Sequence, residues 1–332
     1  MNINQSAISR RSFVAAVSSC LGVSAMGQPL DTVFPSKPLR MIVGYAPGGA
    51  ADTLARLLAN KSNERFGQTT IVDNKPGAGG LLAAEVTANS IADGHTFFLS
   101  DDAQLAIAPG IGEPKAVAMK RLLSPIVGLT TIPMVLVVQE NSPATTLKEL
   151  VALAKAKPGA LNYASAGNGN IAHVSGELFK NLSKTFITHV PYRGGTPALA
   201  SVLSGETQMA FVTVPTALSY IKSGKVRALG VANLKRSQAL PAVPTCIEAG
   251  LNGMVAVSWH GIVVPKATPT AAMTRLAEGF MEILKSGDVT ARLRDMGYEI
   301  TPRNGKEFAD WIQGETEKWQ KLAKVANIKP EA

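Results

Sequence analysis

Three glycine-rich segments of this sequence have residue types suited to binding an anion. Each follows a short apolar run and precedes a helical pattern, and they lie at 47–52 (PGGAAD), 165–170 (SAGNGN) and 191–197 (PYRGGTP). Glycine allows a sharp turn that exposes backbone N–H groups, and the start of a helix carries partial positive charge. Such donors suit a carboxylate or a phosphate. None matches a dinucleotide-binding or Walker sequence, so a simple tight turn with Asp52 as a helix cap is the alternative interpretation of the first.

The residue types of nucleophilic or metal-assisted catalysis are present but poorly arranged. Tyr163 stands where a G-x-S-x-G motif around Ser165 would need its first glycine. His173 and Glu177 could share a helix face as a metal pair, but a third ligand is missing and a solvated helix face is the alternative. Cys246 has no neighbouring histidine or cation, which indicates a packing residue. We therefore expect no catalytic residue, no metal and no cofactor.

Length and composition predict a globular protein with more than one core. A chain of 332 residues suits two domains of ordinary size. Hydrophobic residues make up 46% and charged residues 17%, which excludes disorder. Aromatic residues are only 5%, and no basic patch is interleaved with them, so we expect no nucleic-acid partner. The net charge of +9 favours anionic solutes without identifying one.

Residues 1–27 read as an export signal of the twin-arginine type. The segment 9–14 (SRRSFV) is close to that pattern, an apolar stretch follows at 13–23, and small residues predict cleavage near Ala25. An ordinary Sec signal that carries paired arginines is the alternative, and either route leads out of the cytoplasm. Cys20 follows a weak lipobox, but the apolar residues continue past it, so we expect no lipid anchor there. Cys246 is then the only cysteine left, and it forms no intramolecular disulfide.

The elements that must position the glycine-rich segments are strands and helices that alternate along the chain. Apolar runs at 39–45, 70–72 and 96–99 predict strands, separated by helical patterns that begin at 52 and 81. This βαβαβ order predicts a parallel sheet covered by helices. The pattern restarts after an apolar run at 134–138, where Thr146 and Glu149 form a capping box for a helix that ends at Ala156. Strands are expected at 161–164, 187–190, 209–212, 228–231 and 255–264, and helices at 269–285 and 306–326.

Two such units joined by two crossings would enclose a cleft. Ligands in these sheets bind beyond the carboxyl ends of the strands, where loops lead into helices. We expect one domain to comprise residues 34–135 plus 258–332, and the other residues 136–257. The three glycine-rich segments all follow predicted strands, so we expect them to face this cleft.

Seven short segments, in order along nearly the whole chain, carry a family resemblance. They are 34–40 (FPSKPLR), 45–49 (YAPGG), 74–80 (NKPGAGG), 93–96 (DGHT), 189–195 (HVPYRGG), 224–229 (GKVRAL) and 240–245 (LPAVPT). The sequence resembles the Bug, or TctC-type, solute-binding proteins of tripartite tricarboxylate transporters. The resemblance implies an α/β, two-domain periplasmic-binding-protein fold (type II, Venus-flytrap) with two hinge crossings, which closes on its ligand.

The resemblance also implies a set of ligand-binding residues. In that family the loop matching 48–52 holds one ligand carboxylate through backbone N–H groups and bridging waters, and loops matching 165–169 and 193–196 contribute from the other domain. Carried over to this sequence, the expected ligand-binding residues are Tyr45, Pro47, Gly48, Gly49, Ala50, Asp52, Ser100, Asp101, Ser165, Gly167, Asn168, Arg193, Gly195, Thr196 and Thr213.

Three positions depart from the usual family pattern. Leu81-Leu82 replaces a common Asn-Ile, Thr213 stands where Asp is frequent, and Ser100-Asp101-Asp102 replaces a loop of small neutral residues. A carboxylate facing the cleft would repel a ligand with two carboxylates. Either Asp101 and Asp102 turn away into solvent, or the ligand also has an amine, hydroxyl or aromatic portion. We expect one ligand carboxylate and leave the other end open.

The function implied is that of a non-enzymatic receptor in the periplasm. It would capture a small organic acid and deliver it to the membrane subunits of a tripartite tricarboxylate-type transporter, and a monomer suits this shuttling role. A periplasmic sensor that presents its closed form to a signalling partner is the alternative, because it would use the same pocket. An extracytoplasmic enzyme that uses His173 or His260 is a third reading.

Overall fold

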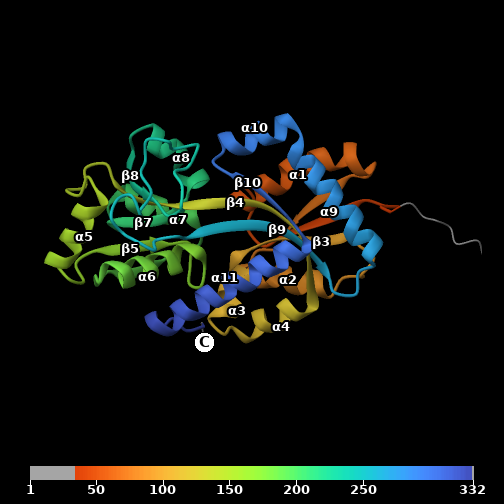
Figure 1. Cartoon of the computed structure of the whole chain (residues 1–332), viewed down its shortest axis with the longest axis horizontal. Coiled ribbons are helices and arrows are strands. Elements are labelled where there is room, and N and C mark those ends of the chain that lie inside the picture. Colours follow the sequence, from red (N-terminus) through yellow and green to blue (C-terminus); the bar gives the residue numbers. More distant parts are fainter. Residues whose placement is uncertain (1–33, 331–332) are drawn as a thin grey trace, which may run out of the picture. The chain divides into compact units, whose positions relative to one another are not determined.

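The computed structural model describes residues 34–330. The export signal expected at 1–27, with its paired arginines, Cys20 and the cleavage position near Ala25, lies outside the described residues. From Phe34 onwards strands and helices alternate, as the apolar runs predict (Figure 1).

The first group of strands forms the predicted parallel unit. Strand β1 pairs in parallel with β2 on one side and with β3 on the other. Its elements are β1 (Leu39–Val43), α1 (Ala50–Phe66), β2 (Thr70–Asn74), η1 (Ala78–Gly80), α2 (Leu81–Ala88) and β3 (Thr96–Asp101). Because these strands run parallel, their carboxyl ends and the loops that follow them lie along one edge of the sheet.

Strand β4 (Leu123–Gln139) runs through both strand groups and is longer than the sequence predicts. The apolar run predicts a strand only at 134–138, and this length is wrong because residues 123–133 belong to it too. Pro125 and Pro133 weaken the strand signal, since proline has no N–H for a ladder. Antiparallel pairing with β9 (Val257–Pro265) holds this part, with register irregularities beside Pro125 and Gly128. Figure 1 shows β4 in yellow beside β9 in cyan. Between β3 and β4 lie η2 (Ala103–Ile107), α3 (Ala108–Gly110) and α4 (Pro114–Leu122).

The second group of strands is arranged around the carboxyl-terminal part of β4. Strands β7 and β8 pair with β4 in antiparallel fashion, and β5 pairs in parallel with β6 and β7. The elements are α5 (Leu147–Ala156), β5 (Asn162–Ser165), α6 (Ile171–Ser183), β6 (Thr188–Pro191), α7 (Gly195–Ser204), β7 (Met209–Thr213), α8 (Val214–Lys222) and β8 (Val226–Val231). The capping box predicted at Thr146 and Glu149 is confirmed at the start of α5.

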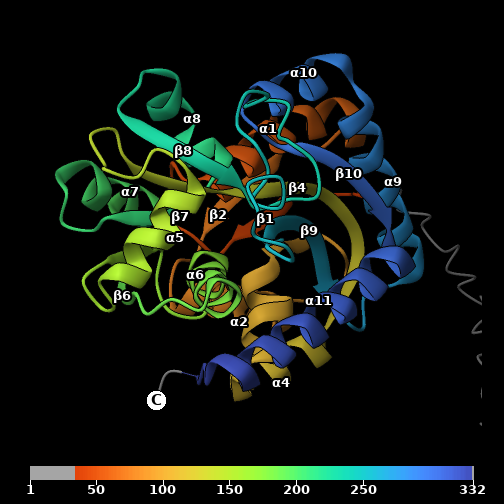
Figure 2. The ribbon, with the colours of Figure 1, turned by 60° about the vertical axis from the view of Figure 1, so that its left-hand side comes forward.

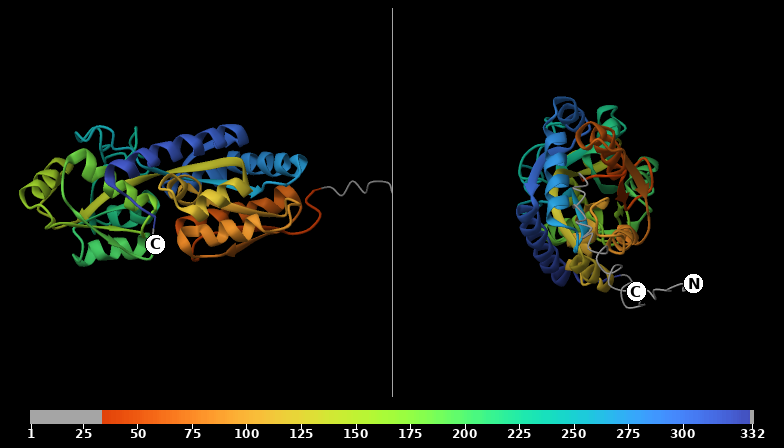
Figure 3. Two further views of the ribbon diagram at one scale, coloured as in Figure 1. Left: turned by 90° about the horizontal axis from the view of Figure 1, so that it is seen from below. Right: turned by 90° about the vertical axis from the view of Figure 1, so that its right-hand side faces the viewer.

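After β9 the chain adds helices and one edge strand to the first group. These elements are α9 (Thr270–Lys285), α10 (Gly287–Asp295), β10 (Glu299–Asn304) and α11 (Gly305–Ala326). The sequence patterns predict α9 and α11 but not α10 or β10. Strand β10 pairs with the first part of β4, on the other side from β9 (Figure 2). Helix α11, dark blue in Figure 3, packs against β4, α3 and α6, so it contacts both strand groups.

Successive side chains of the strands enter different hydrophobic cores. In β1, Met41 and Val43 pack with α1 and α9, whereas Ile42 points to the opposite face. That opposite face continues into the second group, where Met134 and Leu136 of β4 belong to the same core as Ile42. A further core lies under α7 and α8. Strands covered on both faces explain why their sequences read as continuous apolar runs.

Two further features are the surroundings of Cys246 and the composition of the helices. Cys246 is buried beside Gly230, and burial raises the pKa of its thiol to about 12, which agrees with the packing role expected of it. Among residues 34–330, no helix is long and apolar enough to span a membrane.

Candidate functional site

The loop between β1 and α1 brings several of the expected residues to the start of a helix. Pro47, Gly48 and Gly49 are exposed, and Gly48 has a φ of +88°, which favours glycine. Gly49 is the N-cap of α1, and no side chain caps that end. Within residues 34–330, the N–H groups of Ala50 and Ala51 in the first turn of α1 have no hydrogen-bond acceptor. A helix start with open N–H groups is a local structure suited to binding an anion.

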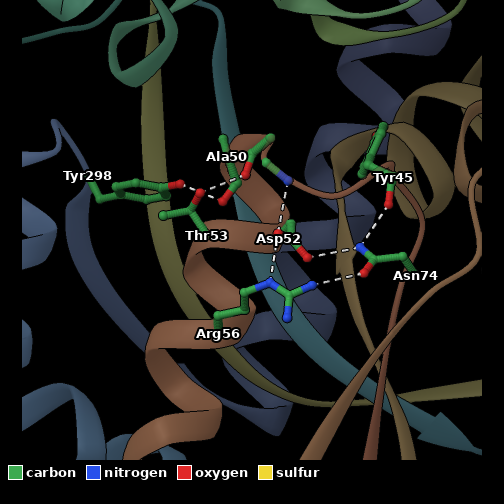
Figure 4. A network of polar contacts seen from close by, with 9 residues as sticks. Tyr45, Ala50, Asp52, Thr53, Arg56, Asn74 and Tyr298 are labelled. Atoms are coloured by element: carbon green, nitrogen blue, oxygen red, sulfur yellow. Dashed lines mark hydrogen bonds and ion pairs between the residues drawn. The ribbon is translucent and has the colours of Figure 1, made fainter.

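Asp52 ties this loop to the rest of the sheet (Figure 4). Its side chain is only 3% exposed and accepts hydrogen bonds from the Gly48 N–H at 2.9 Å, from Arg56 Nε at 2.9 Å and from Asn74 Nδ2 at 3.0 Å. Burial by itself raises the pKa of Asp52, but the bonds from Arg56, Gly48 and Asn74 outweigh it and hold this pKa below its usual value. Asp52 therefore stays ionised, and its hydrogen bonds hold the loop in this conformation. The Gly48 N–H is used inside the protein, which leaves the donors that follow it for a ligand.

The carbonyl groups of the same turn are held from the other side. Thr53 donates through both its N–H and its Oγ1 to the Gly49 carbonyl, each at 2.9 Å. The hydroxyl of Tyr298, which precedes β10, donates to the Ala50 carbonyl at 2.7 Å (Figure 4). With these carbonyl oxygens occupied, the peptide groups at the start of α1 have a defined direction. Preorganised donors of this kind bind an anion without a further ordering cost.

The end of β3 carries the two aspartates that depart from the family pattern. Asp101 is 7% exposed and Asp102 is 1% exposed, so the first of the two alternatives, that they turn away into solvent, is wrong. Asp101 Oδ1 accepts from the Ala103 N–H at 2.9 Å, and Asp102 Oδ1 accepts from the Ser258 hydroxyl. Burial raises the pKa of Asp101 to about 6, although bonds from Tyr45 and Ala103 lower it. Burial and the neighbouring Asp101 raise the pKa of Asp102 well above its ordinary value.

Gln104 connects the aspartates to the first loop. Its Oε1 accepts from the Asp101 N–H at 3.0 Å and from the buried Ser100 hydroxyl at 3.3 Å. Its Nε2 donates to the Gly79 carbonyl at 2.7 Å and to the Tyr45 hydroxyl at 3.1 Å. Gln104 was not expected at the site, yet it joins three residues that were: Tyr45, Ser100 and Asp101.

The expected residues of the second group also follow strands. Ser165, the last residue of β5, is fully buried, and its Oγ lies 2.7 Å from His189 Nε2 and 3.1 Å from the Gly167 nitrogen. The Gly169 N–H donates to His173 Nδ1 at 3.1 Å. The rings of His173 and His189 stack with centroids 4.2 Å apart. Burial, together with the proximity of His173 and Lys180, lowers the pKa of His189 to about 3. These histidines shape the loop that carries Gly167 and the exposed Asn168.

The third glycine-rich segment starts helix α7. Gly194 is the N-cap, with a φ of +122° and no side-chain cap. Thr196 is exposed, and so is Arg193, whose guanidinium has no hydrogen bond or ion pair among the described residues. Thr213 ends β7, and its Oγ1 lies 2.8 Å from that of Thr216. An ideal Cβ on Gly195 would lie 3.6 Å from Thr216 Cγ2, so the segments after β6 and β7 are neighbours.

The structure therefore gathers the expected residues in two sets. One set follows β1 and β3, and the other follows β5, β6 and β7. Residues that the sequence patterns missed are those that hold the first set: Arg56, Asn74, Gln104 and Tyr298. Asn74 lies in a segment that carries the family resemblance, which was the only signal available for it.

Two other features of the described chain concern possible metal ligands and a groove at the opposite ends of the strands. Between Phe34 and Pro330, no group of three or more His, Cys, Asp or Glu side chains is placed to hold a metal ion. Glu177, considered with His173 as a metal pair, accepts from the Tyr163 hydroxyl at 2.7 Å and pairs with Lys180 at 2.8 Å. A groove of about 680 Å³ lies at the amino ends of β1 and β3, lined by residues such as Arg40 and His95, and none of the expected site residues lines it.

Comparison with known proteins identifies the family. The family model described as the tripartite tricarboxylate transporter family receptor (TctC) matches residues 54–328. The chain is 32% identical over 319 residues to Protein BugT of Bordetella pertussis, covering 96% of each chain. It is also similar to the R. palustris protein Rpa4515 with adipate (30% identity, TM-score 0.85, covering 90% of this chain and 100% of that chain). A further similar structure is MatC (Rpa3494) of Rhodopseudomonas palustris with bound malate (30% identity, TM-score 0.79, covering 87% and 99%). The chain therefore belongs to the TctC family of tripartite tricarboxylate transporter receptors, and it has the α/β periplasmic-binding-protein fold of that family.

Proposed function

We propose that this protein is a periplasmic receptor that captures a small organic acid by its carboxylate and delivers it to a transporter in the membrane. The start of α1 carries the proposal. Its N–H groups at Ala50 and Ala51 are open, and its carbonyl groups accept hydrogen bonds from Thr53 and Tyr298. Asp52 holds the preceding loop by accepting from the Gly48 N–H. The malate and adipate bound by similar proteins support a carboxylate ligand.

The other half of the proposed site comes from the loops after β5, β6 and β7. We propose that residues 34–135 plus 258–332 form one domain and 136–257 the other, and that closure brings Gly167, Asn168, Gly195 and Thr196 onto the ligand. The helix start at Gly195 would supply a second set of backbone donors, because Gly194 carries no side-chain cap. Strands β4 and β9 are the two segments that pass between these domains, and they would act as the hinge.

The remaining parts of the proposal concern location and partners. The chain would be exported by its amino-terminal signal and cleaved near Ala25, without a lipid anchor. It would act as a monomer, bind no nucleic acid and catalyse no reaction. Its partners would be the organic acid and the membrane subunits of a tripartite tricarboxylate-type transporter.

Calorimetry with a panel of small carboxylic acids tests the capture step directly. Ala50→Pro removes one N–H at the first position of α1, where proline is compatible with a helix. We expect it to weaken carboxylate binding about tenfold, with little change in melting temperature. Gly287→Pro makes the same change at the start of α10 and should leave binding unaltered. Indifference of the wild-type protein to the whole panel would count against the proposal.

A further inference from the structure

A row of three buried polar side chains crosses the sheet at the carboxyl end of β3. Asp101 of β3 is the antiparallel partner of His260 in β9, and His260 is the partner of Thr130 in β4. Directly paired residues project to the same face, with Cβ atoms about 5 Å apart. Leu99 and Ile262, on that same face, pack under α1 and α9. The row therefore spans roughly 10 Å of sheet, from β3 to β4, on the side where α1 lies.

Two members of this row lack a hydrogen-bond partner. Thr130 is 0% exposed and His260 is 4% exposed, yet neither Thr130 Oγ1 nor His260 Nδ1 has a partner among residues 34–330. Buried polar atoms in native proteins nearly always have one, because a lost hydrogen bond is not replaced by solvent. Two such atoms side by side, next to the Asp101 carboxylate, call for an occupant that the chain itself does not supply.

The row begins near the proposed carboxylate site and extends from it across the sheet. At one end, the Tyr45 hydroxyl is close enough to Asp101 to influence its titration. In the middle, the ring of Tyr298 lies 6.3 Å from that of His260, and the Tyr298 hydroxyl holds the Ala50 carbonyl at the start of α1. A ligand whose carboxylate binds at Ala50 would have this row beside its other end.

The charges of the three side chains in the row limit which chemical group the second end of the ligand can carry. When ionised, Asp101 repels a second carboxylate, and burial keeps His260 neutral, since its pKa is lowered to about 4. The described residues thus place no cation here that could neutralise another anion. The ionised carboxylate only accepts hydrogen bonds, and the hydroxyl and the neutral imidazole can each accept one too, so the three together suit a group that donates hydrogen bonds.

We propose that the Asp101–His260–Thr130 row binds the second end of the solute, and that this end is an ammonium or hydroxyl group instead of a carboxylate. The ligand class is then an amino- or hydroxy-monocarboxylate. The proposal rests on the proposed function, because it needs the first carboxylate at α1. It separates this chain from the similar protein that has bound adipate, which carries a carboxylate at each end.

Matched sets of acids test the proposal by calorimetry on the purified chain. Each set has one chain length, of about four to six carbons, and contains four acids that share one terminal carboxylate. At the other end they carry a second carboxylate, an ammonium group, a hydroxyl group or a plain methyl group. At the length that binds best, we expect the amino or hydroxy acid to bind at least about tenfold tighter than the diacid. Asp101→Asn keeps the size of the side chain and its acceptor for the Ala103 N–H, so it should remove most of this preference.

A pair of threonine variants controls for general effects on the sheet. Thr130→Val removes the hydroxyl of the row and should weaken the amino or hydroxy acid about fivefold while leaving the alkanoate unchanged. Thr131→Val, the next residue, faces the other side as the partner of Trp259 and should leave both unchanged. Thermal melts of each variant confirm that it is folded.

Each remaining outcome overturns the proposal in a recognisable way. If the diacid binds as tightly as the amino and hydroxy acids and Asp101→Asn changes nothing, the row holds buried water only, while the proposed carboxylate receptor stands. If the diacid is preferred in the wild type, the assignment of the second end is wrong. If no acid in any set binds, the proposed function itself fails, and this inference fails with it.

Discussion

At the residue scale, the buried carboxylate of Asp52 holds the loop before α1 through hydrogen bonds from Gly48, Arg56 and Asn74. Asp52→Asn leaves one oxygen for three donors and turns an amide N–H₂ towards Arg56 or Asn74. We expect a loss of about 2 kcal/mol in unfolding free energy and about a tenfold loss in ligand affinity, because buried donors are left unsatisfied. Denaturant melts and calorimetry measure both.

Arg56→Ala is the matched control for this prediction. Its side chain is half exposed, and exposed ion pairs contribute little, so we expect a change below about 1 kcal/mol. Equal effects of the two variants would mean that the ion pair, and not the Gly48 and Asn74 bonds, holds the loop.

Asp101 makes a prediction about pH. Its pKa in the folded protein is about 6, above the value of about 3.9 expected in the unfolded chain. The folded state therefore binds the proton more tightly, and the stabilisation present below about pH 4 is lost as the pH rises through about 6. The groups facing Asp101 are Tyr45, Asp102 and Gln104, with His260 across the strand pair.

Asp101→Asn should remove this dependence, because the amide does not titrate. Between about pH 4.5 and pH 7.5, we expect the unfolding free energy of the variant to rise relative to wild type by on the order of 2 kcal/mol. Carboxylates that do not interact with Asp101, such as Asp52 with its lowered pKa, contribute equally to both proteins and cancel in the difference. A difference that does not vary with pH would show that Asp101 is ionised throughout.

At the element scale, the glycine-rich turn before α2 must leave room for Gln104. Gly80 has a φ of +90°, and a Cβ there would lie 2.9 Å from Gln104 Cδ, whereas a Cβ on Gly79 would meet nothing within 4 Å. We expect Gly80→Ala to cost roughly 3 kcal/mol and to weaken binding, because Gln104 would leave Tyr45 and Asp101. Gly79→Ala, strained only by its φ of +61°, should cost about 1 kcal/mol. Thermal melts and calorimetry compare the two.

At the scale of the whole molecule, the proposed closure has a signature in amide hydrogen exchange. Addition of a binding acid should slow exchange about tenfold in 45–52 and, at the same time, in 165–170 and 193–196. The segment around Asn89 and Ile91, in the groove at the amino ends of the strands, serves as an internal control and should not change. Protection of the first loop alone would mean that the ligand binds without closure.

Local patterns in the chain determined much of this arrangement. Apolar runs and glycine-rich breaks located β1, β2, β3 and the strands of the second group, and the capping box located the start of α5, because these signals act between residues close in sequence. They also placed the glycine-rich loops at the carboxyl ends of strands.

Tertiary structure alone decided the rest. The full length of β4 depends on its pairing with β9, which offsets the two prolines. The bonds of Asn74 and Tyr298 to the first loop join residues far apart in sequence. Burial of Asp101 and Asp102, and the alignment of Asp101 with His260 and Thr130, follow from strand register. Register and burial are properties of the packed sheet, so no local pattern in the chain could reveal them.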